Sequence, residues 1–166
     1  MVTLTIADID AGTPDPVGGT IVRDASGDAT GLLRENADAL VYDVVEQVLT
    51  ERSEAERRAE FDRQVALAGQ EALSEGVTSF HDAGSSFETI DTFKEMAEDG
   101  SLKIRLWVMI RASVAELTEK LDDYRMIGVG DDRLTVRAIK MTIDGALGSH
   151  GAWLLEPYTD LPQSAG

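Results

Sequence analysis

Three side chains capable of acid–base or metal chemistry follow one another closely near the end of this sequence. Lys140 lies within an apolar run of residues 136–143, and the small-residue segment directly after that run contains Asp144 and His150. A strand that ends in a charged side chain and leads into such a segment is typical of a functional site. The structural alternative is a lysine whose stem is buried while its ammonium group reaches water.

Side chains alternate across a β-strand, so the run 136–143 has two faces. One face carries Val136, Ala138, Lys140 and Thr142, and the other carries Arg137, Ile139, Met141 and Ile143. The second face is apolar from residue 139 onward and suits packing beneath helices. In a parallel barrel the first face would line the interior, with Lys140 near the carboxyl end of the strand, where barrel enzymes hold their catalytic groups.

The elements that would position these groups follow a repeating order after residue 76. Apolar alternation predicts three strands, at residues 77–80, 102–110 and 134–143. Between the strands, the pairs Ser85/Glu88 and Ser113/Glu116 have the spacing of capping boxes and predict two helix starts. Strand and helix alternating at this spacing indicate parallel βαβ units with crossover helices, and therefore an α/β fold.

The first 75 residues have a different organisation. Apolar runs at 20–23 and 30–33 flank the turn residues 24–28 and predict a β-hairpin, and helical periodicity covers residues 36–49 and 54–74. We expect residues 1–50 to form a β-hairpin insertion with a linking helix, and residues 51–166 to form part of a (β/α)8 TIM barrel. Because a closed barrel needs roughly 250 residues, three parallel strands predict either a sheet completed by another copy or a piece of a longer protein.

Composition restricts the class of protein. The 166 residues are 43% hydrophobic and 28% charged, as in a globular domain, and the formal net charge is -16. An acidic chain disfavours nucleic acid as a partner. The absence of cysteine excludes disulfides and thiolate metal sites. No secretory signal and no apolar run of the roughly 18 residues needed to span a bilayer is visible, so we expect no membrane partner and a cytoplasmic location.

Five segments, in this order, resemble the landmarks of family-3 amidohydrolases, a group that includes formamide deformylase-like enzymes and metal-dependent hydrolases. They are PDPVGGTIVRD at 14–24, TGLLRENA at 30–37, GVTSFHDAG at 76–84, IKMTIDGALGS at 139–149 and LLEPY at 154–158. The resemblance extends over nearly the whole chain. Five landmarks in sequence are much more specific than any one of them.

The resemblance implies a TIM-barrel hydrolase in which one or two divalent metals, usually zinc, activate water to attack an amide-type carbon–nitrogen bond. Members of the family bind metal through a His-x-His motif on the first strand, a carbamylated lysine on the fourth, and histidines on the fifth and sixth, with an aspartate on the eighth as base. Lys140 matches the bridging lysine. An ammonium group cannot bind a cation, but reaction with carbon dioxide converts the neutral amine into an oxygen ligand.

The sequence also departs from the family pattern, because it contains no His-x-His and only two histidines, His81 and His150. We expect His81, beside Asp82, to be hydrogen-bonded near a strand end in preference to binding metal. His150 stands where relatives commonly carry arginine, and we expect it on a loop or pocket rim. Asp144 could support a metal ligand, or belong to an ordinary Asp-Gly turn. No residue is assigned a catalytic role.

We therefore interpret the chain as a fragment of a metal-dependent amidohydrolase acting on a small amide-type molecule, inactive by itself, with zinc bound in the complete enzyme. A competing hypothesis is a self-contained α/β interaction module that forms a homo-oligomer through open sheet edges, without metal. A third hypothesis gives Lys140 Schiff-base chemistry in a different barrel enzyme.

Overall fold

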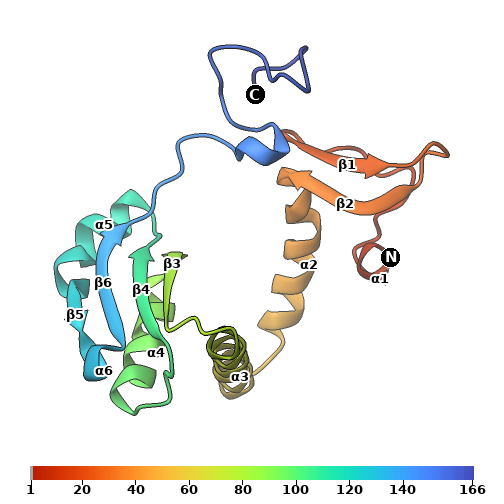
Figure 1. The fold of residues 1–166 in the computed structure, drawn as a ribbon. Coiled ribbons are helices and arrows are strands. Elements are labelled where there is room, and N and C mark those ends of the chain that lie inside the picture. The colour runs from red at the N-terminus through yellow and green to blue at the C-terminus, as the bar shows by residue number, and fades with distance from the viewer. Residues whose placement is uncertain (1) are drawn as a thin grey trace. The chain divides into compact units, whose positions relative to one another are not determined.

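A computed structural model describes residues 2–166, with side chains from Leu4 onward (Figure 1). Contacts divide the chain into two compact units. Unit 1 consists of the segment up to Glu54 together with Thr142–Gly166, and unit 2 consists of Ala55–Met141. We expected residues 51–166 to form one segment, whereas the contacts group the last 25 of them with the N-terminal hairpin.

Unit 1 is built on an antiparallel hairpin of β1 (Gly19–Arg23) and β2 (Ala29–Glu35). The Asp24 carboxylate accepts hydrogen bonds from the backbone N–H groups of Ser26 and Asp28, which closes the expected turn. The remaining elements are α1 (Val2–Ile6), η1 (Asn36–Asp38), α2 (Ala39–Thr50) and η3 (Leu147–Ser149). A small core of Leu4, Ile9, Ile21 and Ala37 lies beneath the hairpin.

Unit 2 is built on a four-stranded sheet in the order β3-β4-β6-β5. The strands β3 (Ser79–Ser85), β4 (Arg105–Ile110) and β6 (Leu134–Ile139) are parallel, as expected, and the short β5 (Met126–Gly128) is antiparallel to β6. The helical segments are α3 (Glu54–Ser74), α4 (Phe87–Glu98), α5 (Val114–Lys120), η2 (Leu121–Tyr124) and α6 (Val129–Asp132). The fold class is mixed α/β.

Local sequence signals explain where the crossover helices begin. The predicted capping box at the start of α5 is present, because Ser113 Oγ accepts from the N–H of Glu116 and the Glu116 carboxylate accepts from the N–H of Ser113. The prediction for α4 was wrong by one residue. Its N-cap is Ser86, whose hydroxyl accepts from the N–H of Thr89, while Ser85 is buried at the end of β3.

Helices α4 and α5 pack against one face of the sheet (Figure 1). Val108, Leu134 and Val136 on this helix face are 0% exposed and join the apolar residues of α4 in the main core. The opposite face, which we call the open face, is formed by Ser79, His81, Arg105, Trp107, Met109, Thr135 and Ala138, none of them buried. Helices therefore cover one face of the sheet and leave the open face uncovered within unit 2.

A β-bulge in β6 changes the expected distribution of its side chains. Val108 pairs with Val136, but the next residue of β4, Met109, pairs with Ala138, so Arg137 is an extra residue. Paired residues of neighbouring strands share a face, which places Val136 on the helix face and Ala138 on the open face. The expectation that Val136 and Ala138 share one face was wrong, because the bulge inverts the alternation.

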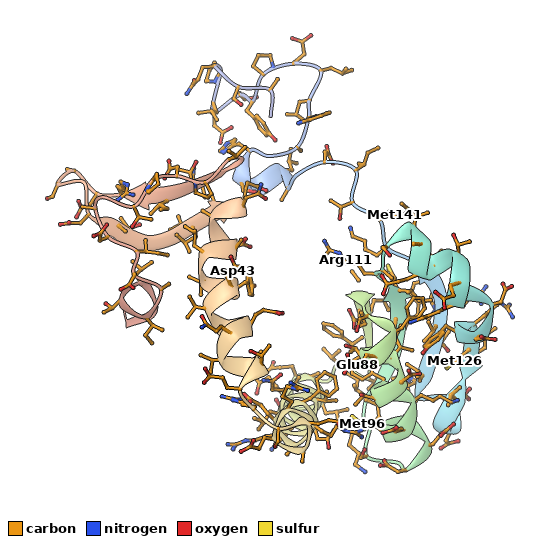
Figure 2. All side chains as sticks on the ribbon, turned by 180° about the vertical axis from the view of Figure 1, so that it is seen from behind. Asp43, Glu88, Met96, Arg111, Met126 and Met141 are labelled. Atoms are coloured by element: carbon orange, nitrogen blue, oxygen red, sulfur yellow. The ribbon has the colours of Figure 1, made fainter. Side chains whose placement is uncertain are left out.

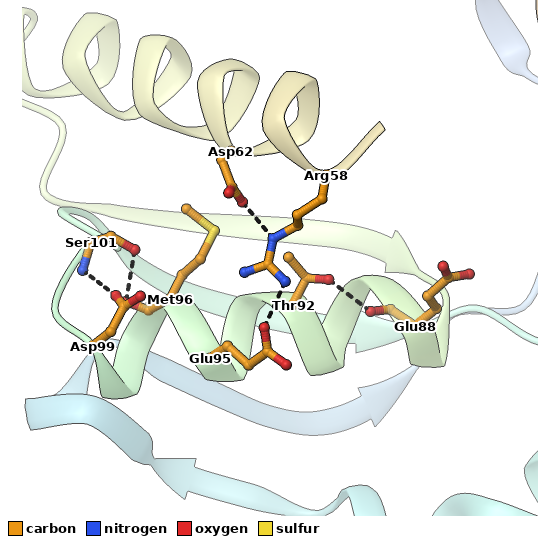
Figure 3. Close-up of polar contacts among 8 residues, drawn as sticks. All are labelled: Arg58, Asp62, Glu88, Thr92, Glu95, Met96, Asp99 and Ser101. Atoms are coloured by element: carbon orange, nitrogen blue, oxygen red, sulfur yellow. Dashed lines mark hydrogen bonds and ion pairs between the residues drawn. The ribbon is translucent and has the colours of Figure 1, made fainter. Parts of the chain in front are cut away.

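Helix α3 contacts α4 through one aromatic pair and one ionic bridge. The rings of Phe61 and Phe93 lie 5.6 Å apart. Arg58 donates to the carboxylates of Asp62 at 2.8 Å and Glu95 at 2.6 Å, and these hydrogen bonds raise the pKa of Arg58 (Figure 3). The side chains of Arg58, Asp62 and Glu95 are 39%, 44% and 61% exposed, so water screens the ion pairs and they contribute little to stability. No helix among residues 2–166 has the length and apolar character required to cross a membrane.

Candidate functional site

Lys140 lies one residue past β6, at the carboxyl edge of the parallel strands. Its backbone N–H donates to the carbonyl of Ile110 at 2.9 Å, which extends the β4–β6 pairing by one residue. Because Ile110 pairs with Ile139 on the helix face, alternation places Lys140 on the open face with Ala138. Lys140 is half-buried. The carboxyl ends of parallel strands are where α/β proteins hold their ligands.

Arg111 occupies the corresponding position on the neighbouring strand, and the sequence analysis did not identify it. It follows β4 directly, and its N–H donates to the carbonyl of Ser85 at 2.9 Å. Its neighbour Ile110 lies on the helix face, so alternation directs the exposed Arg111 side chain to the open face; Figure 2 labels it at the end of the strands. Like Lys140, Arg111 is a charged residue directly after an apolar strand, and this signal is visible in the sequence. The two cations end adjacent strands on the same face.

His81 and Asp82 lie on opposite faces of β3. His81 pairs with Trp107 on the open face, and the two rings are 5.1 Å apart. Asp82 pairs with Val108 on the helix face, where its carboxylate accepts from the N–H of Gly84 at 3.0 Å and from the hydroxyl of Ser85. Asp82 thus stabilises an irregularity at the end of β3, and His81 stacks on an aromatic ring.

His81 is also far from Lys140 along the strands. His81 lies level with Trp107, whereas Lys140 lies level with Arg111, four residues farther along β4. At about 3.3 Å per residue, about 13 Å separates the two levels. His81 therefore does not lie beside Lys140.

Asp144 and His150 belong to unit 1, whereas Lys140 belongs to unit 2. The Asp144 carboxylate accepts from the N–H of Trp153 at 3.0 Å. His150 Nε2 lies 2.9 Å from Asp160 Oδ2, and the hydrogen bond with His150 holds the pKa of Asp160 below its usual value. The His150 ring also meets Tyr158 edge-on at 4.7 Å. Both predicted residues thus have partners that hold the C-terminal segment together.

The C-terminal segment meets the hairpin of unit 1 at a small cleft. Its lining includes Arg34, Glu35, Ser149, His150 and Trp153, and its volume is about 460 Å³. The Ser149 hydroxyl donates to the Glu35 carboxylate. His150 adopts a left-handed backbone conformation, with φ of 65°. Contacts such as that between Ser149 and Glu35 join residues 142–166 to the hairpin, and His150 is among the residues that line this cleft.

The side chains present do not fit a complete metal centre. Among residues 2–166, no three histidine, aspartate or glutamate side chains converge closely enough to hold an ion. A structural or catalytic zinc site needs three or four protein ligands. Unit 2 offers Lys140, which would become a ligand only after carbamylation. Its neighbour at the end of β4 is Arg111, whose guanidinium group only donates hydrogen bonds and cannot bind a cation.

Comparisons with known proteins cover almost all of the chain. Residues 2–165 match the amidohydrolase family. The chain is 29% identical over 168 residues to YtcJ of Bacillus subtilis (strain 168), which is named as an amidohydrolase, and 35% identical over 173 residues to Protein LONG AFTER FAR-RED 3 of Arabidopsis thaliana. Each alignment covers 98% of this chain but only 29% and 28% of those proteins.

A solved structure has a similar fold. It is an uncharacterized metal-dependent hydrolase from Pyrococcus horikoshii OT3, which superposes with a TM-score of 0.58 at 21% identity over 99% of this chain and 30% of that one. The chain thus spans less than a third of the length of the relatives that it matches. The matches nevertheless run from one end of the described chain to the other, and the chain belongs to the amidohydrolase family.

Proposed function

We propose that this chain is a segment of a metal-dependent hydrolase that cleaves an amide-type carbon–nitrogen bond in a small molecule. In this proposal β3, β4 and β6 are three consecutive strands of a (β/α)8 barrel, and the open face lines its interior. The family membership supports the class of reaction. The observation that carries the assignment of the site is the position of Lys140, at the carboxyl edge of parallel strands and on the face without helices.

In the complete enzyme Lys140 would be carbamylated and would bridge divalent metals, for which we propose zinc. The remaining ligands would come from outside these 166 residues, because no three histidine, aspartate or glutamate side chains among the described residues form a group that could hold an ion. We derive no catalytic step from this chain alone, and we expect the isolated chain to be inactive. A supporting or substrate-binding role for His81, Asp82, Asp144 and His150 stays a prediction.

The test compares the 166-residue chain with a longer polypeptide that includes the flanking coding sequence. We expect the longer protein to contain metal, measured by elemental analysis, and to hydrolyse members of a panel of amides and cyclic amides. Lys140→Ala in the longer protein should remove both properties, whereas Arg137→Ala, a matched change on the same strand, should preserve them. Stoichiometric zinc and amidase activity in the short chain would contradict the expectation that it is incomplete.

One observation favours the interaction module as a second candidate. Strand β3 has a single strand neighbour, β4, so the backbone groups along its other edge have no partner strand within the part of the chain that the structure describes. Such edges pair readily with a second chain. Sedimentation of the metal-free chain separates the candidates, because a stable homo-oligomer without metal favours the module. Borohydride trapping with a carbonyl substrate would reveal Schiff-base chemistry at Lys140.

A further inference from the structure

We propose that Arg111 holds the carbamate that forms on Lys140, and that it does so before any metal binds. The inference rests on the proposed function, which assigns the carbamylated lysine to Lys140. Both residues belong to unit 2. Its test measures the modification itself and not hydrolysis.

Backbone hydrogen bonds place the two residues side by side. Lys140 donates to the carbonyl of Ile110, the residue directly before Arg111, and Arg111 donates in turn to Ser85, both at 2.9 Å. Neighbouring strands in a sheet lie about 4.8 Å apart. Alternation directs both side chains to the open face, because Ile110 lies in the core on the helix face and Ile139, though 41% exposed, is its pairing partner.

The position of the arginine depends on Gly84. This glycine lies at the irregular end of β3 with φ of 148°, a conformation that other residues rarely adopt. A methyl group on Gly84 would lie 3.0 Å from Arg111 Cδ and 3.1 Å from its Cβ. The arginine stem therefore occupies the space that a side chain at position 84 would fill.

Within unit 2 no carboxylate neutralises this pair of cations. Neither Arg111 nor Lys140 takes part in an ion pair among the described residues. The acid of β3, Asp82, lies on the helix face and is occupied by Gly84 and Ser85. His81 shares the open face but lies four residues lower, stacked on Trp107. Two like charges at adjacent strand ends repel each other.

Carbamylation would reverse that repulsion. The ammonium group of Lys140 first gives a proton to water. The nitrogen lone pair then forms an N–C bond to carbon dioxide, one C=O electron pair moves onto oxygen, and the nitrogen gives its second proton to water. The side chain thereby changes from one positive to one negative charge, and a guanidinium group can donate two parallel hydrogen bonds to the new carboxylate-like group.

The test is carbon-13 NMR of the full, metal-free 166-residue chain in labelled bicarbonate at one fixed pH. Lys140→Ala identifies the carbamate signal by removing it. Arg111→Gln should lower the carbamylated fraction about fivefold, the upper range for an exposed ion pair. Arg111→Lys should give a carbamylated fraction between those of wild type and Arg111→Gln, because lysine keeps the positive charge but lacks the two parallel N–H donors of the guanidinium group. Arg111→Glu, which reverses the charge, should abolish it.

Arg137→Gln is the matched control, because Arg137 lines a groove on the helix side with Leu121 and Tyr124. It should leave the signal unchanged, and circular dichroism should show that every variant remains folded. Equal signals in wild type and Arg111→Gln, an equal loss in Arg137→Gln, or no carbamate on wild type at any bicarbonate concentration would each overturn the inference. None of these results decides the proposed function, which depends on metal content and hydrolysis in the longer protein.

Discussion

Deletion of Arg137 tests the bulge in β6, on which the direction of Lys140 depends. Arg137 is the extra residue between the pairs Val108–Val136 and Met109–Ala138. Its removal leaves a strand in regular alternation, in which Lys140 keeps its place on the open face. We therefore expect the free energy of unfolding to change by less than about 1 kcal/mol, as for most surface changes.

A strand without a bulge would respond very differently. In such a strand Val136, Ala138 and Lys140 would share the helix face, and deleting one residue would exchange the faces on one side of the gap. To keep Ala138 and Lys140 in place, Leu134 and Val136, both 0% exposed, would have to leave the core, at a cost of about 1.5–3 kcal/mol for each side chain. For a domain of the size of unit 2, each kcal/mol lowers Tm by roughly 4–8 °C, so a cost of about 3 kcal/mol would lower Tm by roughly 12–24 °C.

Thermal unfolding followed by circular dichroism distinguishes the two outcomes. Deletion of Thr135, in the regular part of the strand, is the matched control, because it must move Leu134 or Val136 out of the core. Both side chains are 0% exposed. Burial of such a side chain contributes about 1.5–3 kcal/mol, so the control should show a large loss. A loss as large after deletion of Arg137 would refute the bulge assignment.

Three further predictions concern unit 2. Ser113→Ala removes the cap of α5 and should lower the free energy of unfolding by about 1 kcal/mol, measured by urea denaturation. Val136→Ala removes two buried carbons and should cost about 2 kcal/mol in the same assay, whereas Arg137→Ala should cost less than about 0.5 kcal/mol. The hydrogen bond from Tyr124 to Asp91 raises the pKa of Tyr124 to about 12, so its contribution to stability is complete below about pH 10, the pKa of an unfolded tyrosine, and is lost as the pH rises toward 12. Tyr124→Phe should remove this alkaline component from the pH dependence of the urea midpoint.

Features set by neighbouring residues in the chain were predictable. The hairpin turn at Asp24, the helix over Glu54–Ser74 and the capping box at Ser113 all follow from short-range spacing, and the structure confirms them. The parallel order of β3, β4 and β6 followed from the repeated strand and helix pattern. Predicting these elements requires no information about contacts between residues far apart in the sequence.

Features set by pairing across the fold were not predictable. The bulge at Arg137 is defined by which residue of β4 lies opposite, and nothing in residues 134–140 marks it. The grouping of residues 142–166 with unit 1 depends on contacts such as that between Ser149 and Glu35, which are 114 positions apart. The one-residue shift of the α4 cap arose because Asp82 binds the Ser85 hydroxyl, leaving Ser86 to cap the helix.

Strand β5 limits where a further strand could be added to the sheet of unit 2. It lies along the outer edge of β6, yet its ladder joins only Met126 to Val136, with one isolated bridge from Val129 to Leu134. A longer parallel strand arriving at that edge would compete for the same backbone donors and acceptors and would offer more of them. A strand added next to β6 would therefore have to displace β5. At the other edge of the sheet, no strand of unit 2 pairs with the outer side of β3, so a strand could be added there without displacing another.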